Sequence, residues 1–160
     1  MKNSRNIKST VTCFIHKDDK WLMLRRSKDR KYLPGILNGP GGKIGKDEGI
    51  LEAAKRELME ETRVKAVNLR LKAAGVGRFL ESDDEYHFKV IVGEWFEGDP
   101  YSDDGDELAW MRPEEILADG DLLAELRQVF EKFIDPKHPT FTYKSFYTPP
   151  NNLVEIVIEK

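Results

Sequence analysis

Residues 39–64 place more negative charge on one helical face than stability alone favours. Glu57, Glu60 and Glu61 are separated by one, three and four positions, so at 3.6 residues per turn they share one narrow arc of a helix. Each close pair of like charges costs roughly 0.2–0.5 kcal/mol. Carboxylates in the last turns are disfavoured by roughly 0.3–1 kcal/mol each. A bound divalent cation would remove both penalties, so this stretch predicts a helix that holds a metal ion.

The same helix carries the features that would hold it on a fold. Leu51, Ala54 and Leu58 recur with the spacing of an apolar stripe that can pack against a sheet. Asp47 is the expected N-cap of a helix over about residues 48–62. The stripe lies beside the acidic arc, so we expect the carboxylates at the edge of a cleft.

Arg56 and the preceding glycines add to the predicted site. Arg56 lies one helical turn from both Glu52 and Glu60, and it can orient them by charge-assisted hydrogen bonds. Before the helix, Pro40-Gly41-Gly42 allows the backbone to approach whatever the carboxylates bind. The predicted ligand is therefore in contact with both the helix and this loop.

Together these residues resemble the Nudix box, in which spaced Gly, Glu, Arg-Glu, apolar, Glu-Glu, Gly and apolar elements recur. Here the corresponding residues are Gly42, Glu48, Arg56-Glu57, Leu58, Glu60-Glu61, Arg63 and Val64. A match of this length and spacing is very specific for a motif. The chain is therefore identified as similar to the Nudix hydrolases.

Arg63 is the one departure, since the box has glycine there. Glycine would take the left-handed conformation that ends the helix. Arginine in that conformation costs on the order of 1 kcal/mol. Alternatively the helix runs slightly longer and Arg63 pairs with Glu60. The substitution affects the helix exit and leaves the carboxylates unchanged.

Composition bounds the class of protein. The chain has 160 residues and a net charge of −3, which argues against a nucleic-acid polymer as partner, because such binders are basic. No apolar run approaches about 18 residues, so no membrane span is expected, and the N-terminus lacks a secretory signal's apolar core. Cys13 is the only cysteine, so we expect no internal disulfide and a cytoplasmic protein.

The pattern along the chain predicts one domain over residues 1–160. Strands are expected at 10–16, 21–26, 67–80, 86–96, 107–111, 140–147 and 153–159. Pro113 opens a helical turn, and Asp121 is the expected N-cap of a second main helix. Gly75 and Gly77 suggest a bulge or bend. The order fits an α/β fold with a mixed β-sheet between helices, which is also the Nudix α/β/α sandwich.

The resemblance implies a metal centre. Clustered carboxylates are hard oxygen donors that suit Mg²⁺ or Mn²⁺. By resemblance Glu57, Glu60 and Glu61 bind the ions, the carbonyl of Gly41 adds a ligand, and Arg56 belongs to the catalytic set. The base for the attacking water is either one of these glutamates or a carboxylate on a later loop, for which Glu107 is the candidate, also as a metal ligand. The alternative for Glu107 is a solvated loop charge.

The resemblance also narrows the substrate. Residues 38–43 are similar to the Asn-Gly-x-Gly-Gly-Lys of MutT homologues that hydrolyse oxidised purine nucleoside triphosphates. Asn38 then contacts the purine edge, or it only makes the turn before Gly39. The other expected substrate-binding residues are Gly42, Lys43, Arg26 and Asp119. Of Arg25 and Arg26 at most one meets phosphate, since they point to opposite faces of a strand.

Three functions remain open from the sequence. The first is metal-dependent hydrolysis of a nucleoside triphosphate to monophosphate and pyrophosphate, with a purine expected as the base and 8-oxo-dGTP as one candidate substrate. The second is hydrolysis of another diphosphate derivative, such as a nucleotide sugar or ADP-ribose. The third is a nucleotide sensor without turnover. In each case the partner is a small nucleotide, and the protein is a monomer or a homodimer.

Overall fold

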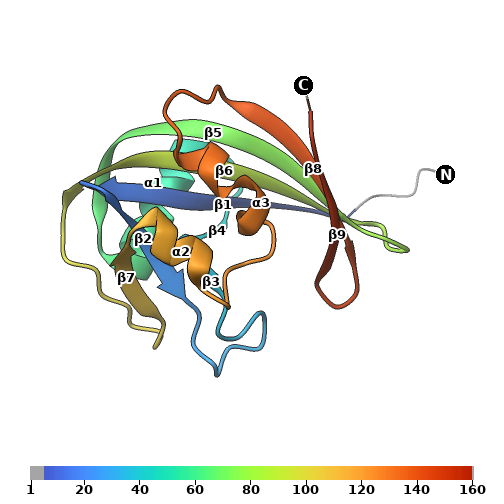
Figure 1. The fold of residues 1–160 in the computed structure, drawn as a ribbon, viewed down its shortest axis with the longest axis horizontal. Coiled ribbons are helices and arrows are strands. Elements are labelled where there is room, and N and C mark those ends of the chain that lie inside the picture. The colour runs from blue at the N-terminus through green and yellow to red at the C-terminus, as the bar shows by residue number, and fades with distance from the viewer. Residues whose placement is uncertain (1–5, 160) are drawn as a thin grey trace.

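One curled, mixed sheet organises the chain (Figure 1). The computed structural model describes residues 6–159, and within them nine strands run in the order β3-β2-β1-β6-β5-β8-β9, with β4 beside β1 and β7 beside β2. The strands are β1 (Asn6–Lys17), β2 (Lys20–Arg25), β3 (Leu37–Asn38), β4 (Gly41–Lys43), β5 (Lys65–Phe79), β6 (Asp84–Glu97), β7 (Glu107–Met111), β8 (Phe141–Thr148) and β9 (Asn152–Ile158). The β1–β6 and β5–β8 pairs are parallel and the other pairs are antiparallel. The predicted mixed sheet is confirmed.

Helices cover both faces of this sheet. They are α1 (Ile50–Thr62), α2 (Pro113–Ala118) and α3 (Leu126–Ile134). Alternate residues of β1 point to opposite faces, which gives two separate cores. Val11, Cys13 and Ile15 pack in the core under α1, whereas Phe14 packs in the core on the side of α2 and α3. The predicted α/β/α sandwich is therefore confirmed.

Helix α1 packs on the sheet through small residues. Ala53, Ala54 and Leu58 are buried against β1, and the Cys13 thiol lies 3.9 Å from the carbonyl oxygen of Ala54. Leu51, which we expected in this apolar stripe, is 41% exposed. That expectation was wrong because the two alanines bring the helix axis close to the sheet and turn Leu51 outward.

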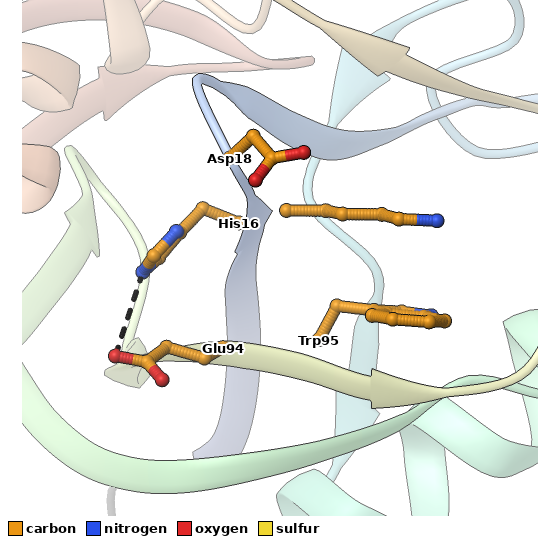
Figure 2. Close-up of a pocket in the computed structure, with 5 residues that line it drawn as sticks. His16, Asp18, Glu94 and Trp95 are labelled. Carbon is orange, nitrogen blue, oxygen red and sulfur yellow. Dashed lines mark ion pairs between the residues drawn. The ribbon is translucent and has the colours of Figure 1, made fainter.

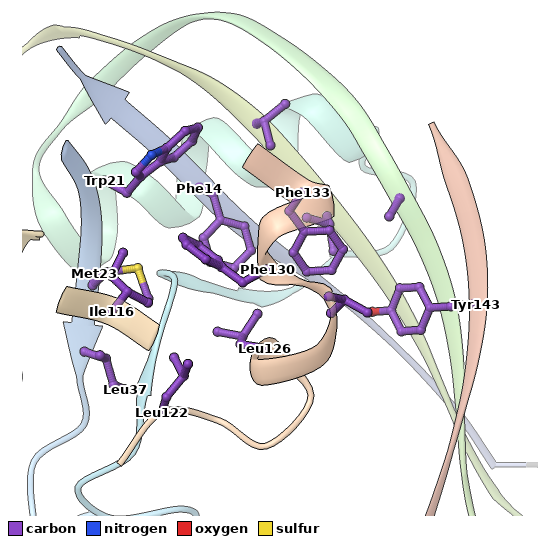
Figure 3. Packing of buried hydrophobic residues seen from close by; sticks show 14 of the residues in the cluster. Phe14, Trp21, Met23, Leu37, Ile116, Leu122, Leu126, Phe130, Phe133 and Tyr143 are labelled. Carbon is purple, nitrogen blue, oxygen red and sulfur yellow. The ribbon is translucent and has the colours of Figure 1, made fainter. Parts of the chain in front are cut away.

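Aromatic packing holds α3 on the opposite face (Figure 3). The ring of Phe14 contacts Phe130 edge to face, with ring centres 5.6 Å apart, and stacks on Phe133 at the same separation. Such pairs contribute about 0.5–1.5 kcal/mol beyond the area that they bury. Buried Lys72 of β5 donates to the carbonyl oxygens of Asp135, at 2.7 Å, and His138. The end of α3 is thereby tied to the sheet.

Two predicted helix starts were wrong. Helix α1 begins after Gly49, while Asp47 lies in the preceding turn with φ of 60°. Helix α3 begins after Glu125 rather than after Asp121. The carbonyl oxygen of Asp121 instead accepts the N–H of Leu37 at 2.9 Å, so this segment runs beside β3. An aspartate favours an N-cap locally, but these tertiary contacts decide where each helix starts.

Gly75 and Gly77 do not form the expected bulge. Both pair in register with β6 and β8, and the irregular positions of β5 lie earlier, between residues 65 and 73. A Cβ on Gly75 would lie 2.5 Å from Cε2 of Tyr143, and one on Gly77 would lie 2.6 Å from Cε2 of Phe88. The glycines are needed because aromatic rings lie directly against this part of the sheet.

None of the helices within residues 6–159 is long and apolar enough to cross a membrane.

Candidate active site

The glycine-rich segment lies against β1 and against α1. A Cβ on Gly41 would collide with the carbonyl oxygen of Val11, and the N–H of Cys13 donates to the carbonyl oxygen of Pro40 at 2.8 Å. A Cβ on Gly42 would lie 2.5 Å from both carboxylate oxygens of Glu57. Only glycine at these two positions allows the loop, the strand and the Glu57 carboxylate to lie so close together.

Arg56 binds three carboxylates at once. Its Nε and Nη2 donate to the two oxygens of Glu48 at 2.7 and 2.9 Å, and its Nη1 donates to Glu57 at 2.8 Å and Glu60 at 3.2 Å. The pKa of Glu48 falls to about 2 because Arg56 and the Gly45 N–H both donate hydrogen bonds to its carboxylate. The expected pair with Glu60 is present, and Glu48 takes the place that we expected for Glu52.

Glu61 is a half-buried carboxylate of the box. It accepts a hydrogen bond from the N–H of Gly41 at 2.8 Å. Burial raises the pKa of Glu61 to about 7, and the charges of Glu57 and Asp106 add to this shift, while the Gly41 N–H and Arg30 oppose it. A bound cation favours the ionised form of such a group. Glu61 can therefore exchange a proton near neutral pH.

The donor set suits a hard divalent cation. Glu57, Glu60, Glu61 and the carbonyl of Gly41 offer oxygen atoms alone, as Mg²⁺ or Mn²⁺ requires. Within the described part of the chain, no three acidic, histidine or cysteine side chains converge closely enough to hold an ion as they stand. Glu57 and Glu60 converge instead on Nη1 of Arg56. The oxygen donors of these residues therefore suit a divalent cation, and Arg56 holds two of the carboxylates together.

Arg63 takes the left-handed conformation. It has φ of 61° and caps α1 through its N–H, which donates to the carbonyl oxygen of Met59 at 3.1 Å. Its guanidinium binds both oxygens of Asp103 at 2.9 Å and lies 4.6 Å from the ring centre of Tyr101. The first of the two alternatives is thus confirmed, and Arg63 pairs with Asp103 rather than with Glu60. These contacts offset the backbone cost of replacing glycine.

The later acidic loop presents Asp106 to the site, and the sequence reasoning overlooked it. Glu107 is 80% exposed in its side chain and lies 3.9 Å from Nε of Arg25. The side chain of Asp106 is only 1% exposed, and its charge raises the pKa of Glu61. The alternating pattern of β7 indicates that Asp106 points inward, because it lies on the same side of the chain as Leu108 and Trp110.

The expected substrate-binding residues are spread over several contacts. Nη2 of Arg25 binds Asp119 at 2.5 Å, so the pKa of that carboxyl is lowered. Arg25 is therefore held in ion pairs rather than merely solvated. Nε of Arg26 donates to the carbonyl oxygen of Tyr32 at 2.8 Å. Lys43 is exposed, and its carbonyl oxygen accepts Nη2 of Arg56 at 2.9 Å.

Asn38 uses one end of its amide locally. Its Oδ1 accepts the N–H of Gly39 at 2.8 Å, which is the turn contact that we considered as the alternative to base recognition. The amide nitrogen of Asn38 makes no hydrogen bond within residues 6–159. Asn38 can therefore make the turn and still offer two N–H donors to a ligand.

Two buried polar groups lie beside Tyr147, and the sequence reasoning did not identify them. They are Oε2 of Glu125 and Oγ of Ser145. Burial raises the pKa of the Tyr147 hydroxyl, Glu125 adds to this shift and Ser145 opposes it, so the hydroxyl interacts with both groups. Polar contacts with Tyr147 therefore account for Glu125 and Ser145 within the fold.

A separate hollow lies at the turn between β1 and β2 (Figure 2). It is lined by His16, Lys17, Asp18, Glu94 and Trp95. His16 pairs with Glu94 at 3.9 Å, and the ammonium of Lys17 lies 4.0 Å from the ring centre of Trp95. Its lining includes none of the box carboxylates, so we do not assign it to the active site.

Comparison with known proteins identifies the fold family. The NUDIX domain model matches residues 7–134. The structure is similar to that of a MutT protein from Bacillus halodurans, with a TM-score of 0.82, 25% identity and coverage of 95% of this chain and 97% of that one. A MutT protein from Methanosarcina mazei is similar with a TM-score of 0.70 and 27% identity, over 82% of this chain and 96% of that chain.

Two curated relatives from Escherichia coli are also similar. The uncharacterized Nudix hydrolase YfcD is 32% identical over 103 residues, which cover 62% of this chain and 55% of YfcD. The chain thus spans about half the length of that relative. Phosphatase NudJ is 29% identical over 121 residues, covering 73% of this chain and 76% of NudJ. With the family model matching most of its length, this chain belongs to the Nudix domain family.

Proposed function

We propose that the protein is a metal-dependent pyrophosphohydrolase that cleaves a purine nucleoside triphosphate to the monophosphate and pyrophosphate. The observation that carries the proposal is the contact between Glu61 and the Gly41 N–H, which holds a buried carboxylate beside a glycine-rich loop and next to Glu57. Similarity to MutT structures supports the triphosphate as substrate. Mg²⁺ is the expected ion, and Mn²⁺ can replace it.

In this proposal each box residue has its own task. A bound divalent ion neutralises charge on the phosphate oxygens and lowers the pKa of a bound water. Glu57, Glu60 and Glu61 would hold the ion together with the Gly41 carbonyl, and Arg56 orients Glu57 and Glu60. Glu61 is also the proposed base for the attacking water, because the Gly41 N–H holds its carboxylate beside the glycine-rich loop.

The later carboxylate can be assigned in two ways. Glu107 is exposed and free to turn, so substrate and metal could draw it toward the site. Asp106 is already close to Glu61 but is held by Arg30. We retain Glu107 as the candidate ligand and assign Asp106 a different role below.

Base recognition involves the Asn38 side chain. Its amide N–H groups are free while its Oδ1 accepts the N–H of Gly39. A guanine edge, or its 8-oxo form, presents a carbonyl acceptor that suits these N–H donors. Asp119 is bound to Arg25 and would need to leave that pair to contact a base.

The test is a panel of nucleoside triphosphates, nucleotide sugars and ADP-ribose, assayed with Mg²⁺ for released pyrophosphate and phosphate. We expect pyrophosphate from purine triphosphates, with guanine or 8-oxoguanine nucleotides preferred. In Asn38→Ala the preference for guanine nucleotides over pyrimidine nucleotides should fall. Release from ADP-ribose or sugar nucleotides alone would show that the substrate assignment is wrong.

The setting proposed for this activity is the reducing cytoplasm. Cys13 is the only cysteine in the sequence and is buried as a free thiol. Burial raises its pKa, which keeps the thiol protonated and unreactive.

A further inference from the structure

Arg30 and Asp106 form an ion pair beside the box that the tasks above do not use. We propose that Arg30 binds the polyphosphate of the substrate, and that Asp106 is a positioning residue that holds Arg30 toward Glu61. This inference rests on the proposed function, because it names a further contact of the same substrate. It concerns residues outside the box and outside the glycine-rich loop.

Two hydrogen bonds join the side chains of Arg30 and Asp106. Oδ2 of Asp106 accepts Nη2 of Arg30 at 2.5 Å, and Oδ1 accepts Nε of Arg30 at 3.2 Å. The same Oδ1 also accepts the backbone N–H of Ser27 at 2.8 Å. Asp106 therefore fixes both the start of the loop that carries Arg30 and the direction of its guanidinium.

The loop itself is closed at its base. The N–H of Arg26 donates to the carbonyl oxygen of Ile36 at 2.9 Å, and the N–H of Gly35 donates to the carbonyl oxygen of Arg26 at 3.0 Å. Between these contacts lie three basic residues and one acidic residue, Lys28, Arg30, Lys31 and Asp29. The loop brings positive charge to a site whose other side chains are carboxylates.

Contacts of the acidic loop place the pair close to the box. The N–H of Tyr101 donates to the carbonyl oxygen of Thr62 at 3.0 Å, and Arg63 binds Asp103 at 2.9 Å, so this loop starts at the C-terminal end of α1. A few residues later Nη2 of Arg30 lies 3.6 Å from Asp104 and 2.5 Å from Asp106. The loop therefore joins the end of the box helix to the guanidinium of Arg30.

Arg30 keeps one edge free for a ligand. Its side chain is 32% exposed, whereas the side chain of Asp106 is almost fully buried. Within residues 6–159, Nη1 of Arg30 has no hydrogen-bond partner. A guanidinium held on one side by a buried carboxylate and open on the other is suited to bind a phosphate oxygen.

The experiment measures binding of inorganic tripolyphosphate by calorimetry with Mg²⁺ present, so that no base and no turnover are needed. The variants are Arg30→Ala, Arg30→Lys, Asp106→Asn and the double variant Arg30→Ala/Asp106→Asn. The matched control is Asp103→Asn, which removes an exposed aspartate–arginine pair from the same acidic loop. We expect Arg30→Ala and Asp106→Asn each to weaken binding about tenfold, and Asp103→Asn to leave it unchanged.

The double variant distinguishes positioning from a general loss of structure. If Asp106 acts through Arg30, the double variant should bind no more weakly than Arg30→Ala, because the two losses are not additive. Additive losses would show that Asp106 does not position Arg30. If Asp106→Asn fails to fold, Arg30→Ala and its partial recovery in Arg30→Lys still decide the phosphate contact.

Two results would overturn the inference. One is wild-type affinity for tripolyphosphate in Arg30→Ala, and the other is absence of tripolyphosphate binding by the unmodified protein. Binding by the unmodified protein that depends on Arg30, together with no hydrolysis of any nucleotide, would support the phosphate contact while defeating the proposed function. The two failures can therefore be told apart.

Discussion

Glu61 accepts a hydrogen bond from the backbone N–H of Gly41 at 2.8 Å, which joins the last turns of α1 to strand β4. The two residues are twenty positions apart in the chain, and this contact joins the glycine-rich segment of the box to its helix. Because the bond is made to an enclosed carboxylate, the protonation of Glu61 is coupled to binding of a cation.

Replacing Glu61 by glutamine should leave the fold intact and remove most turnover. Glutamine keeps an oxygen that can accept the Gly41 N–H, but it cannot take a proton from water or balance a metal charge. We expect a loss of at least about a hundredfold in kcat, measured as pyrophosphate release. The control is the melting temperature, which should stay close to that of the unmodified protein. Turnover at the unmodified rate would rule out Glu61 as base and ligand.

Without metal, stability should fall as pH rises from about 5 to 8. Burial raises the pKa of Glu61 from 4.5 to about 7, so in this window the folded state binds more protons than the unfolded state. The contribution is on the order of 3 kcal/mol. Thermal unfolding in a chelator across this range measures it, and Glu61→Gln should show a flatter profile. Mg²⁺ should restore stability mainly at the upper end, where the carboxylate is ionised.

Gly42→Ala should disturb the box by steric contact alone. The added Cβ would lie 2.5 Å from the carboxylate oxygens of Glu57, which must then move. We expect a stability loss of about 1–3 kcal/mol and a drop in kcat. Gly120→Ala is the matched control, because a Cβ there meets nothing within 4 Å. Equal turnover in both variants would show that the position of Glu57 does not depend on Gly42.

Asn38→Ala should raise KM selectively for purine triphosphates. The variant loses the free amide N–H groups as well as the turn contact to Gly39. Loss of a base contact should raise KM about tenfold for purines, with a smaller change for pyrimidines. Steady-state kinetics on matched purine and pyrimidine substrates decides this. An equal increase for both classes would mean that Asn38 only shapes the loop.

The parts of the fold that were predicted correctly depend on local patterns. The alternation in β1 and the helical spacing of the box carboxylates each involve neighbours within a few residues, so the sequence displays them directly. The positions of helix starts were predicted less well. Asp47 and Asp121 have the side chains of N-caps, but contacts to Leu37 and within the turn before α1 determine the true starts.

The parts of the site that were missed depend on pairing between distant segments. Strand β7 pairs with β2, placing Glu107 opposite Arg25 and bringing Asp106 to Arg30 across 76 residues of sequence. A run of acidic residues does not reveal which one points inward. Glu125 likewise comes to lie beside Tyr147 only once α3 packs over the sheet.

The ring of Tyr143 occupies the space that a side chain at position 75 would need, because a Cβ on Gly75 would overlap that ring. Neither position can therefore change freely on its own. Among relatives of this chain, a larger residue at the position of Gly75 should occur together with a smaller one at the position of Tyr143. The two sites should thus covary, and an evolutionary path between the two arrangements must pass through a clash or a void.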